Sequence, residues 1–218
     1  MPDDIDCPVL NVADIEPISV ANGPGKRFVI WVQGCPFRCP GCSNDDFLEF
    51  KPAQKFTVSE LYARVVAEEQ IEGVTFSGGE PMAQAHALSV LAENLKAAGL
   101  SVVCFSGFSL EELRSKQETW QLKLLSQIDV LIDGRYNRNQ PGSGLRGSTN
   151  QNLHFLSGKY NETTVELKRT KTIELASDAQ QIRATGVWDS EIFSRLNKVL
   201  EDGPRRLISL DEQESAGA

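Results

Sequence analysis

The sequence has no long apolar run and no excess of positive charge. No stretch of its 218 residues approaches the roughly 20 apolar residues that a membrane-spanning helix needs, so we expect no membrane partner. Residues 1–4 lack the basic and apolar regions of a signal peptide, which predicts a cytoplasmic protein. With 22 Lys and Arg against 30 Asp and Glu, the net charge of −8 argues against a nucleic-acid partner.

Cysteine is scarce and unevenly placed, with five residues at positions 7, 35, 39, 42 and 104. A secreted disulfide framework has an even number of cysteines spread along the chain, so this class of protein is excluded. The three central cysteines lie too close together to pair with one another, whereas thiolates on one short loop can converge on a metal. The chain is long enough to bury a core without disulfides, so a metal here serves function rather than folding.

Strand and helix patterns alternate along the first two thirds of the chain. The predicted strands are 28–32, 73–77, 100–105 and 128–132. The predicted helices are 57–69 and 83–98, and helical segments are predicted over 109–127. Two of these helices begin with capping boxes, at Thr57 with Glu60 and at Ser109 with Glu112. The alternation predicts an α/β fold with a mainly parallel sheet. A complete barrel needs roughly 250 residues, so we predict a partial, open β/α barrel.

The two ends of the chain are expected to differ from this core. Residues 1–22 are predicted to precede the ordered core, and residues 137–152 to form a long functional loop. Further on, the patterns indicate short strands at 163–168, 171–176 and 182–187, a helix from Asp189 to about Leu200, and disorder after 210. We therefore divide the chain into a partial-barrel core, 1–157, and a C-terminal hairpin-plus-helix extension with a disordered tail, 158–218.

Unusual segments follow the predicted strands. The first strand leads into the cysteine run, and the second into Gly78-Gly79-Glu80-Pro81. The other two end at Ser106-Gly107 and at Asp133-Gly134-Arg135. Because the carboxyl ends of parallel strands share one edge of a sheet, we predict an active site at that edge.

The cysteine run has the spacing C-x3-C-x2-C from Cys35 to Cys42. Three thiolates without an adjacent fourth ligand suit a [4Fe-4S] cluster that keeps one iron open. A structural zinc site needs a fourth Cys or His and remains an alternative. The residues available for it are Cys7, Cys104, His86 and His154. Of these, Cys104 is interpreted as a small buried residue of an apolar strand, and the two histidines as structural.

Together with Gly78-Gly79-Glu80-Pro81, this spacing resembles the radical S-adenosylmethionine (SAM) enzymes, which are oxidoreductases. The resemblance implies that Cys35, Cys39 and Cys42 hold a [4Fe-4S] cluster whose open iron binds SAM. It also implies that one electron cleaves SAM to a 5′-deoxyadenosyl radical, and that Gly78, Gly79 and Glu80 bind the methionyl end of SAM. Glycines permit close backbone approach, and a carboxylate suits an amino group.

Within that superfamily the chain is most similar to the anaerobic ribonucleotide reductase activating proteins, which are glycyl-radical enzyme activases. The similarity covers about residues 15–157 and is carried by the segments 22–25, 39–44, 129–134 and 145–151. It implies a glycyl-radical enzyme as partner, such as anaerobic ribonucleotide reductase, and reduced flavodoxin or ferredoxin as electron donor. Asp133 and Arg135 occupy positions where related activases have an acid and a Lys near SAM.

Two features depart from the pattern. Gly41 stands where many superfamily members have an aromatic residue that packs on adenine, which leaves Phe37 or the backbone for this contact. Residues 158–218 extend beyond the smallest activators, which leaves the partner open. Two other functions therefore remain: a radical SAM enzyme acting on another peptide or small molecule, and a non-catalytic metal-binding interaction module.

Overall fold

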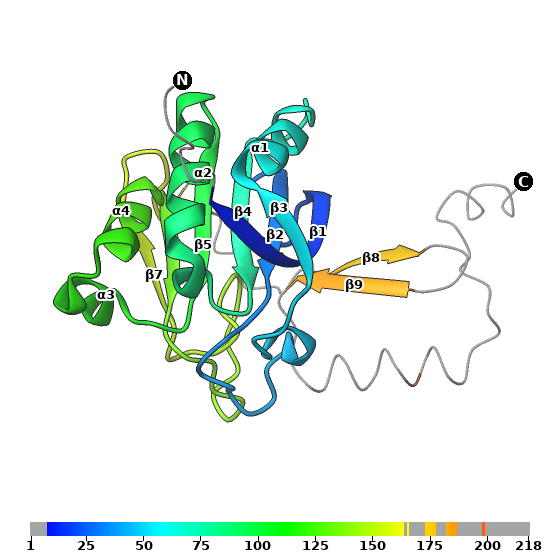
Figure 1. The fold of residues 1–218 in the computed structure, drawn as a ribbon. Helices are drawn as coiled ribbons and strands as arrows, with labels where there is room; N and C mark the ends of the chain where they lie inside the picture. Colours follow the sequence, from blue (N-terminus) through cyan, green and yellow to red (C-terminus); the bar gives the residue numbers. More distant parts are fainter. Residues whose placement is uncertain (1–7, 164, 166–172, 178–181, 187–197, 199–218) are drawn as a thin grey trace, which may run out of the picture. The chain divides into compact units, whose positions relative to one another are not determined.

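The computed structural model describes residues 8–163, 165, 173–177, 182–186 and 198. The chain divides into two compact units, Met1–Trp188 and Asp189–Ala218, and the second is described only at residue 198. The first unit contains one seven-stranded sheet and one two-stranded sheet (Figure 1). Among the described residues, no helix combines the length and the apolar character that crossing a membrane requires.

The large sheet has four parallel strands at its centre and antiparallel strands at its edges. Its order is β3-β1-β2-β4-β5-β6-β7, in which β2, β4, β5 and β6 are parallel neighbours. The strands are β1 (Val9–Ser19), β2 (Arg27–Val32), β3 (Gln54–Thr57), β4 (Gly73–Gly78), β5 (Ser101–Ser106), β6 (Val130–Asp133) and β7 (Asn152–Phe155). The edge strands β3 and β7 do not pair with each other, so the predicted open, mainly parallel α/β fold is confirmed.

Helices α1 (Val58–Val66), α2 (Ala85–Ala97), α3 (Leu110–Lys116) and α4 (Thr119–Gln127) connect the strands. The capping boxes predicted at Thr57 and Ser109 are both formed. The helical segments predicted over 109–127 are two helices, and Gln117 ends α3 by adopting a left-handed conformation with a φ of 53°. Short 3-10 helices, η1 (Asp45–Phe47) and η2 (Pro81–Gln84), follow the cysteine run and Glu80.

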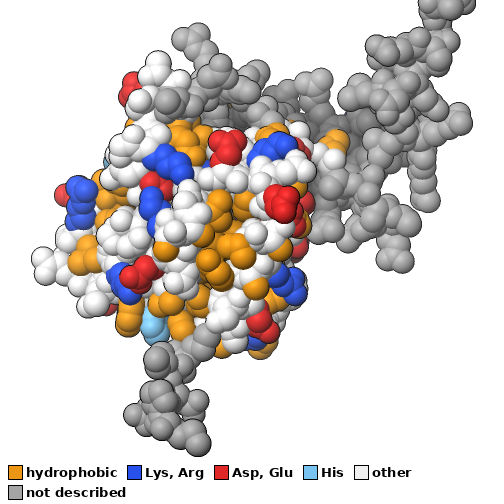
Figure 2. All heavy atoms as spheres, turned by 90° about the horizontal axis from the view of Figure 1, so that it is seen from above, with side chains coloured by type: hydrophobic (Ala, Val, Ile, Leu, Met, Phe, Trp, Pro, Cys, Tyr) orange, Lys and Arg blue, Asp and Glu red, His pale blue; other side chains and the backbone are white. Residues whose placement is uncertain are grey.

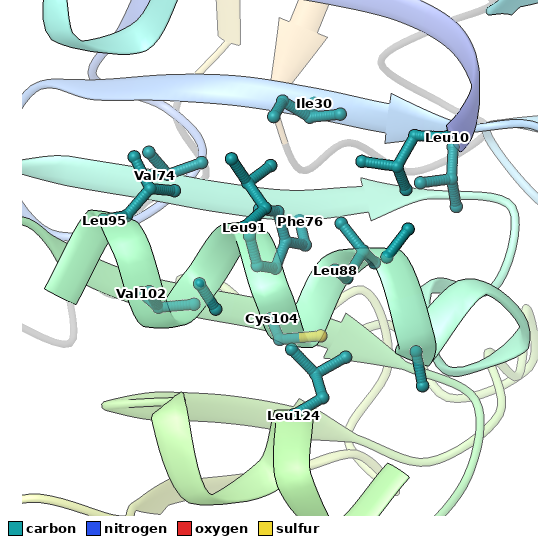
Figure 3. Close-up of a cluster of buried hydrophobic side chains, with 14 of the residues drawn as sticks. Leu10, Ile30, Val74, Phe76, Leu88, Leu91, Leu95, Val102, Cys104 and Leu124 are labelled. Carbon is teal, nitrogen blue, oxygen red and sulfur yellow. The ribbon is translucent and has the colours of Figure 1, made fainter. Parts of the chain in front are cut away.

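The core lies between the sheet and its helices, and the two-residue period of the strands decides which side chains enter it. Val102, Cys104 and Leu131 pack in the main cluster with α2 and α4 (Figure 3). Their neighbours Val103, Val130 and Ile132 form a smaller cluster with partly buried side chains, among them Phe155. Cys104 is fully buried, as predicted.

The N-terminal segment corrects one prediction. The ordered core does not begin after residue 22, because β1 pairs with β2 on one side and with β3 on the other. β1 buries Leu10 and Val12 completely in the main cluster. β1 and β3 were not predicted as strands, and they pair with each other although β2 lies between them in the sequence.

The C-terminal extension is described in part. The predicted hairpin is present as β8 (Ile173–Ser177) paired antiparallel with β9 (Ile182–Gly186). The expected helix from Asp189 and the tail lie outside the described residues, as does most of the expected strand at 163–168. The boundary proposed after residue 157 stays a prediction.

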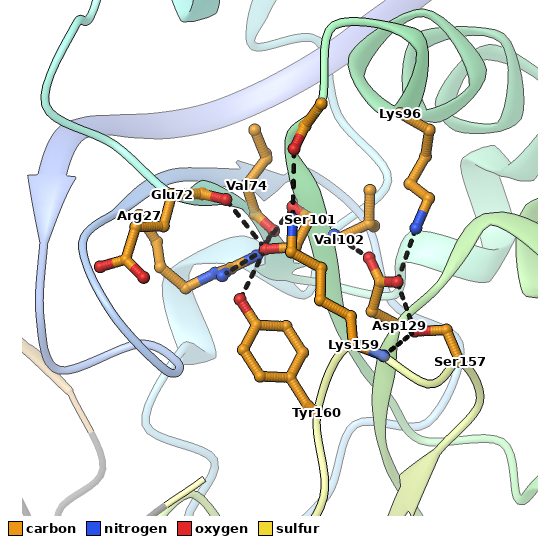
Figure 4. A network of polar contacts seen from close by, with 11 residues as sticks. Arg27, Glu72, Val74, Lys96, Ser101, Val102, Asp129, Ser157, Lys159 and Tyr160 are labelled. Carbon is orange, nitrogen blue, oxygen red and sulfur yellow. Dashed lines mark hydrogen bonds and ion pairs between the residues drawn. The ribbon is translucent and has the colours of Figure 1, made fainter. Parts of the chain in front are cut away.

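A buried arginine holds the amino edge of the parallel strands, opposite the cysteine run. Arg27 is fully buried, and its guanidinium donates five hydrogen bonds (Figure 4). The acceptors are Thr75 Oγ1, Ser101 Oγ, and the carbonyl oxygens of Pro24, Val74 and Ser101. Ser101 also shares a hydrogen bond of 2.8 Å with the hydroxyl of Tyr160. This network ties together the starts of β2, β4 and β5.

Charged side chains of both signs are mixed on the face drawn in Figure 2. Lys and Arg, Asp and Glu, and apolar side chains alternate there, and the described residues on that face form no continuous basic patch. A mixed surface lacks the basic field that favours nucleic-acid binding. The expectation of no nucleic-acid partner stays a prediction.

Candidate active site

A cavity of about 480 Å³ lies at the carboxyl edge of the parallel strands. Residues following all four strands line it. They include Cys35, Phe37, Cys39 and Cys42 after β2, Gly78 to Glu80 from β4 onward, Ser106 and Gly107 from β5 onward, and Gly134 and Tyr136 after β6. A cavity of this volume accommodates a small-molecule ligand. The parallel arrangement has thus brought the segments singled out in the sequence to one place.

The cysteine loop is fastened at its start by backbone hydrogen bonds. The amide of Gly34 donates to the carbonyl of Phe47 at 2.8 Å, and the amide of Cys35 to that of Leu48 at 2.9 Å. Gly34 and Gly41 adopt φ values of 102° and 75°, which favour glycine. Cys35 is buried, the other two cysteines are half-buried, and all three line the cavity.

The surroundings of Cys35 and Cys42 favour the neutral thiols over the thiolates that bind a metal. Burial raises the pKa of Cys35 and of Cys42. Nearby negative groups raise both further, namely Glu80 and Cys39 for Cys35, and the other two thiols and Asp45 for Cys42. Backbone amides oppose this: those of Phe37 and Arg38 donate toward Cys35 and lower its pKa. Bound iron stabilises the thiolate form, as it does in iron–sulfur proteins.

The donor set fits a three-cysteine iron–sulfur cluster better than zinc. Three of the four candidates for a fourth zinc ligand lie away from the cavity lining: Cys104 in the core, His86 against Trp120, and His154 on Asp133. The fourth candidate, Cys7, lies outside the described residues. Within the described part of the chain, no group of three Cys, His, Asp or Glu side chains is already converged as a metal site.

Gly78, the last residue of β4, and Gly79 allow close contact with the end of β2 and the start of the cysteine loop. A Cβ at Gly79 would lie 2.2 Å from the carbonyl oxygen of Gly34, and a Cβ at Gly78 would lie 2.5 Å from the amide nitrogen of Val32. The Glu80 amide donates to that same Gly34 carbonyl at 2.8 Å. The residues predicted for SAM binding therefore lie directly against the start of the cysteine loop.

Glu80 is a buried carboxylate with three protein donors. Its Oε1 accepts from the Met82 amide and the Ser106 hydroxyl, both at 2.9 Å, and its Oε2 accepts from the Gly107 amide at 2.7 Å. Burial raises the pKa of Glu80 to about 7, although these hydrogen bonds oppose the shift. A ligand ammonium group in the cavity would favour its charged form.

Asp133 and Arg135 border the site without lining the cavity. Asp133 is buried, and its carboxylate accepts from the Leu110 amide at 2.6 Å, from Asn152, and from His154 Nε2 at 2.9 Å. The guanidinium of Arg135 lies over the ring of Phe37, with Cζ 4.6 Å from the ring centroid. Their predicted contacts with SAM stay predictions. The aromatic residues that line the cavity are Trp31, Phe37, Phe47, Phe105 and Tyr136.

One wall of the cavity was missed from the sequence. β1 contributes Asp14, Glu16 and Ile18, and the β8–β9 hairpin contributes Glu174 and Leu175. The carboxylate of Glu174 accepts from the hydroxyl of Ser19 and from the amide of Val20, at 2.9 Å for the amide. The sequence placed a hairpin here, but no local signal indicated that it would reach the cavity.

Comparisons with known proteins agree with this site. A family model described as a 4Fe-4S single cluster domain matches residues 21–154, which is more than half of the chain. Among curated proteins, the anaerobic ribonucleoside-triphosphate reductase-activating protein of Enterobacteria phage T4 is 33% identical over 151 residues, which cover 66% of this chain and 93% of that protein.

Two further relatives carry the same name. The Vibrio cholerae protein is 33% identical, covering 66% of this chain and 97% of the relative, and the Escherichia coli K12 protein is 29% identical, covering 67% and 99%. The crystal structure of QueE from Escherichia coli aligns at 20% identity with a TM-score of 0.36, over 45% of this chain and 52% of that one. The chain is therefore a radical SAM enzyme of the 4Fe-4S single-cluster family, related to the anaerobic ribonucleotide reductase-activating proteins, with a [4Fe-4S] cluster and SAM as its cofactors.

Proposed function

We propose that this enzyme generates a glycyl radical on a partner enzyme, in the simplest case an anaerobic ribonucleotide reductase. The observation that supports it best is the convergence of the cysteine loop and the Gly78–Glu80 turn on one cavity. Relatives named for activating that reductase align with this chain over 93% or more of their length. The partner, a reduced flavodoxin or ferredoxin as electron donor, and a cytoplasmic location are parts of the same proposal.

The proposed role of each site residue follows from its position in the cavity wall. Cys35, Cys39 and Cys42 are the proposed ligands of the cluster, which with SAM supplies a 5′-deoxyadenosyl radical when both are bound. Gly78 and Gly79 are proposed to bind the methionyl end of SAM through their backbone, which lines the cavity. The close packing of Gly79 on Gly34, at the start of the cysteine loop, supports this assignment.

Glu80 is the proposed acceptor for the SAM amino group. Its carboxylate is already oriented by three donors from both sides of the turn, so a ligand ammonium meets a preorganised group. Burial raises the pKa of Glu80 to about 7, and a bound ammonium group would lower it again and so favour the charged carboxylate. Asp133 holds the end of β6 against Leu110 and His154, and Arg135 acts beside Phe37; both support the site through their neighbours.

A second candidate function is favoured by one observation. The β8–β9 hairpin lies outside the matched region 21–154 and contributes Leu175, half of whose surface is exposed, to the cavity wall. A wall that the family match does not include can admit a different peptide or small molecule. In that case the enzyme cleaves SAM in the same way but takes its hydrogen atom elsewhere.

The deciding experiment is anaerobic reconstitution with iron and sulfide, followed by reduction and assay for 5′-deoxyadenosine and methionine from SAM. Adding an anaerobic ribonucleotide reductase from the same source should then yield a stable organic radical by electron paramagnetic resonance. SAM cleavage without any such radical would favour the second candidate. Tight binding of one zinc with SAM left intact would overturn both and support the interaction module.

A further inference from the structure

Phe37 is the aromatic residue of the cysteine loop, between Cys35 and Cys39. Its ring meets that of Phe108 edge to face, with centroids 4.7 Å apart and planes at 73°. It also lies on Gly107, where a Cβ would be only 2.4 Å from the ring. Phe37 thus bridges the loop after β2 and the segment after β5, and it lines the cavity with the thiols.

Arg135 completes the contact from the segment after β6. Its guanidinium carbon lies 4.6 Å from the centroid of Phe37, and its backbone carbonyl accepts from Asn150 at 2.8 Å. The ion pair with Glu112, at 3.4 Å between exposed side chains, contributes little to stability. The stacking on Phe37 is therefore the main ordered contact of this guanidinium.

The position of Phe37 also fixes a backbone group. Its amide and that of Arg38 donate toward the sulfur of Cys35. Arg38 has a left-handed φ of 48°, an uncommon conformation for a residue with a side chain. A ring held from two sides keeps this stretch of backbone in place, so the two amides continue to point at the sulfur.

We propose that Arg135, Phe37 and Phe108 form an aromatic clamp that positions the cysteine loop and helps the enzyme retain its cluster. The proposal rests on the assignment of the three cysteines as cluster ligands. Arg135 is then a positioning residue that acts through Phe37. Amide donors to cluster sulfur and a nearby positive charge both favour the reduced cluster, so the clamp also raises the reduction potential.

The test compares loaded proteins carrying Arg135→Gln, Arg135→Lys or Phe37→Leu with wild type. Cation–π and aromatic pairs contribute about 0.5–2 kcal/mol, which corresponds to about 2- to 30-fold in a rate. We expect Arg135→Gln and Phe37→Leu to lose iron to a chelator faster by a factor in that range. Their reduction potentials should shift to more negative values, and Arg135→Lys should restore both quantities most of the way.

Arg64→Gln is the matched control. Arg64 is also exposed and lies over a phenylalanine, Phe56, with Cζ 4.5 Å from the ring centroid, but neither residue lines the cavity. It should leave iron release and potential unchanged. Equal iron release and equal potential in wild type, Arg135→Gln and Phe37→Leu would overturn the clamp. A wild-type protein that takes up no [4Fe-4S] cluster would instead contradict the ligand assignment.

Discussion

The carboxylate of Glu80 accepts the backbone amide of Gly107 at 2.7 Å, joining the segments that follow β4 and β5 through a buried group. Both residues line the cavity beside the cysteine loop. Glu80 was predicted only as a ligand-binding acid, and the structure gives it a second role, because it holds the ends of β4 and β5 together.

The buried state of Glu80 predicts a pH dependence of the metal-free protein. Its folded pKa of about 7 is above the ordinary 4.5, so the folded state binds the proton more tightly than the unfolded chain. The free energy of unfolding should therefore fall by about 3 kcal/mol as the pH rises from the ordinary to the folded pKa, and this contribution should be constant above it. Urea unfolding between about pH 4.5 and about pH 8 measures this.

Glu80→Gln is the variant that isolates this contribution. Gln does not titrate, so the fall in stability between the two pKa values should disappear. At the acid end Glu80 is protonated, and both oxygens of the carboxyl can still accept hydrogen bonds, whereas the amide nitrogen of Gln cannot. One of the three donors then lacks an acceptor, which should cost about 1–3 kcal/mol. An unchanged pH profile in Glu80→Gln would show that another group is responsible. In the loaded enzyme the same variant should weaken SAM binding while cluster assembly is kept.

Cysteine substitutions should separate ligands from core. Cys39→Ala should abolish cluster retention and SAM cleavage, because two thiolates remain for the cluster. Cys104→Ala should leave both nearly intact and cost about 1 kcal/mol of stability, since it removes one buried sulfur from the main cluster. Iron content and 5′-deoxyadenosine formation are the measurements. SAM cleavage retained in Cys39→Ala would contradict its assignment as a ligand.

The contact between the two cavity loops can be tested at Gly79. Gly79→Ala places a Cβ 2.2 Å from the Gly34 carbonyl, so the turn and the cysteine loop must separate. We expect a loss of about 3 kcal/mol in thermal or urea unfolding and poor cluster loading. Gly158→Ala is the control, because a Cβ at that position meets nothing within 4 Å. Similar behaviour of the two variants would show that the loops are not in contact.

The amino edge of the sheet depends on Arg27. Arg27→Met leaves buried oxygens of Val74 and Ser101 without their donors, and we expect a loss of about 3–5 kcal/mol in urea unfolding. Arg64→Met, at an exposed arginine, should change stability by less than about 1 kcal/mol. The cysteine loop lies at the opposite edge of the sheet, so Arg27→Met protein that remains folded should still load a cluster. A small stability change would mean that the network contributes little.

Local chemistry allowed several elements to be predicted from the sequence. The capping boxes at Thr57 and Ser109 depend on residues three positions apart, and both form. The parallel strands were predicted because their apolar runs and intervening helical patterns lie within short windows. Since parallel strands align their carboxyl ends, the meeting of the cysteine loop with Gly78–Glu80 also followed from the sequence.

Other features depend on residues that only folding brings together. β1 has no regular apolar alternation, and its stability comes from pairing with β2 and β3. Arg27 precedes an apolar run and resembles a surface charge until β4 and β5 supply its acceptors. The carboxylate of Asp133 accepts hydrogen bonds from Leu110, Asn152 and His154, partners that its sequence neighbours do not reveal, and its predicted position beside SAM stays a prediction.

The sequence alone therefore indicated iron–sulfur and SAM chemistry, because the spacing of the cysteines and the glycines of the Gly78–Glu80 turn are local features that can be read without the fold. Tertiary structure decided how each charged residue is used. Glu80 is buried and connects the segments after β4 and β5, Arg135 stacks on Phe37, and the β8–β9 hairpin lines the cavity. The physical reason is that burial and pairing depend on partners far apart in the chain, and these set the energy of a charge more strongly than its neighbours in sequence do.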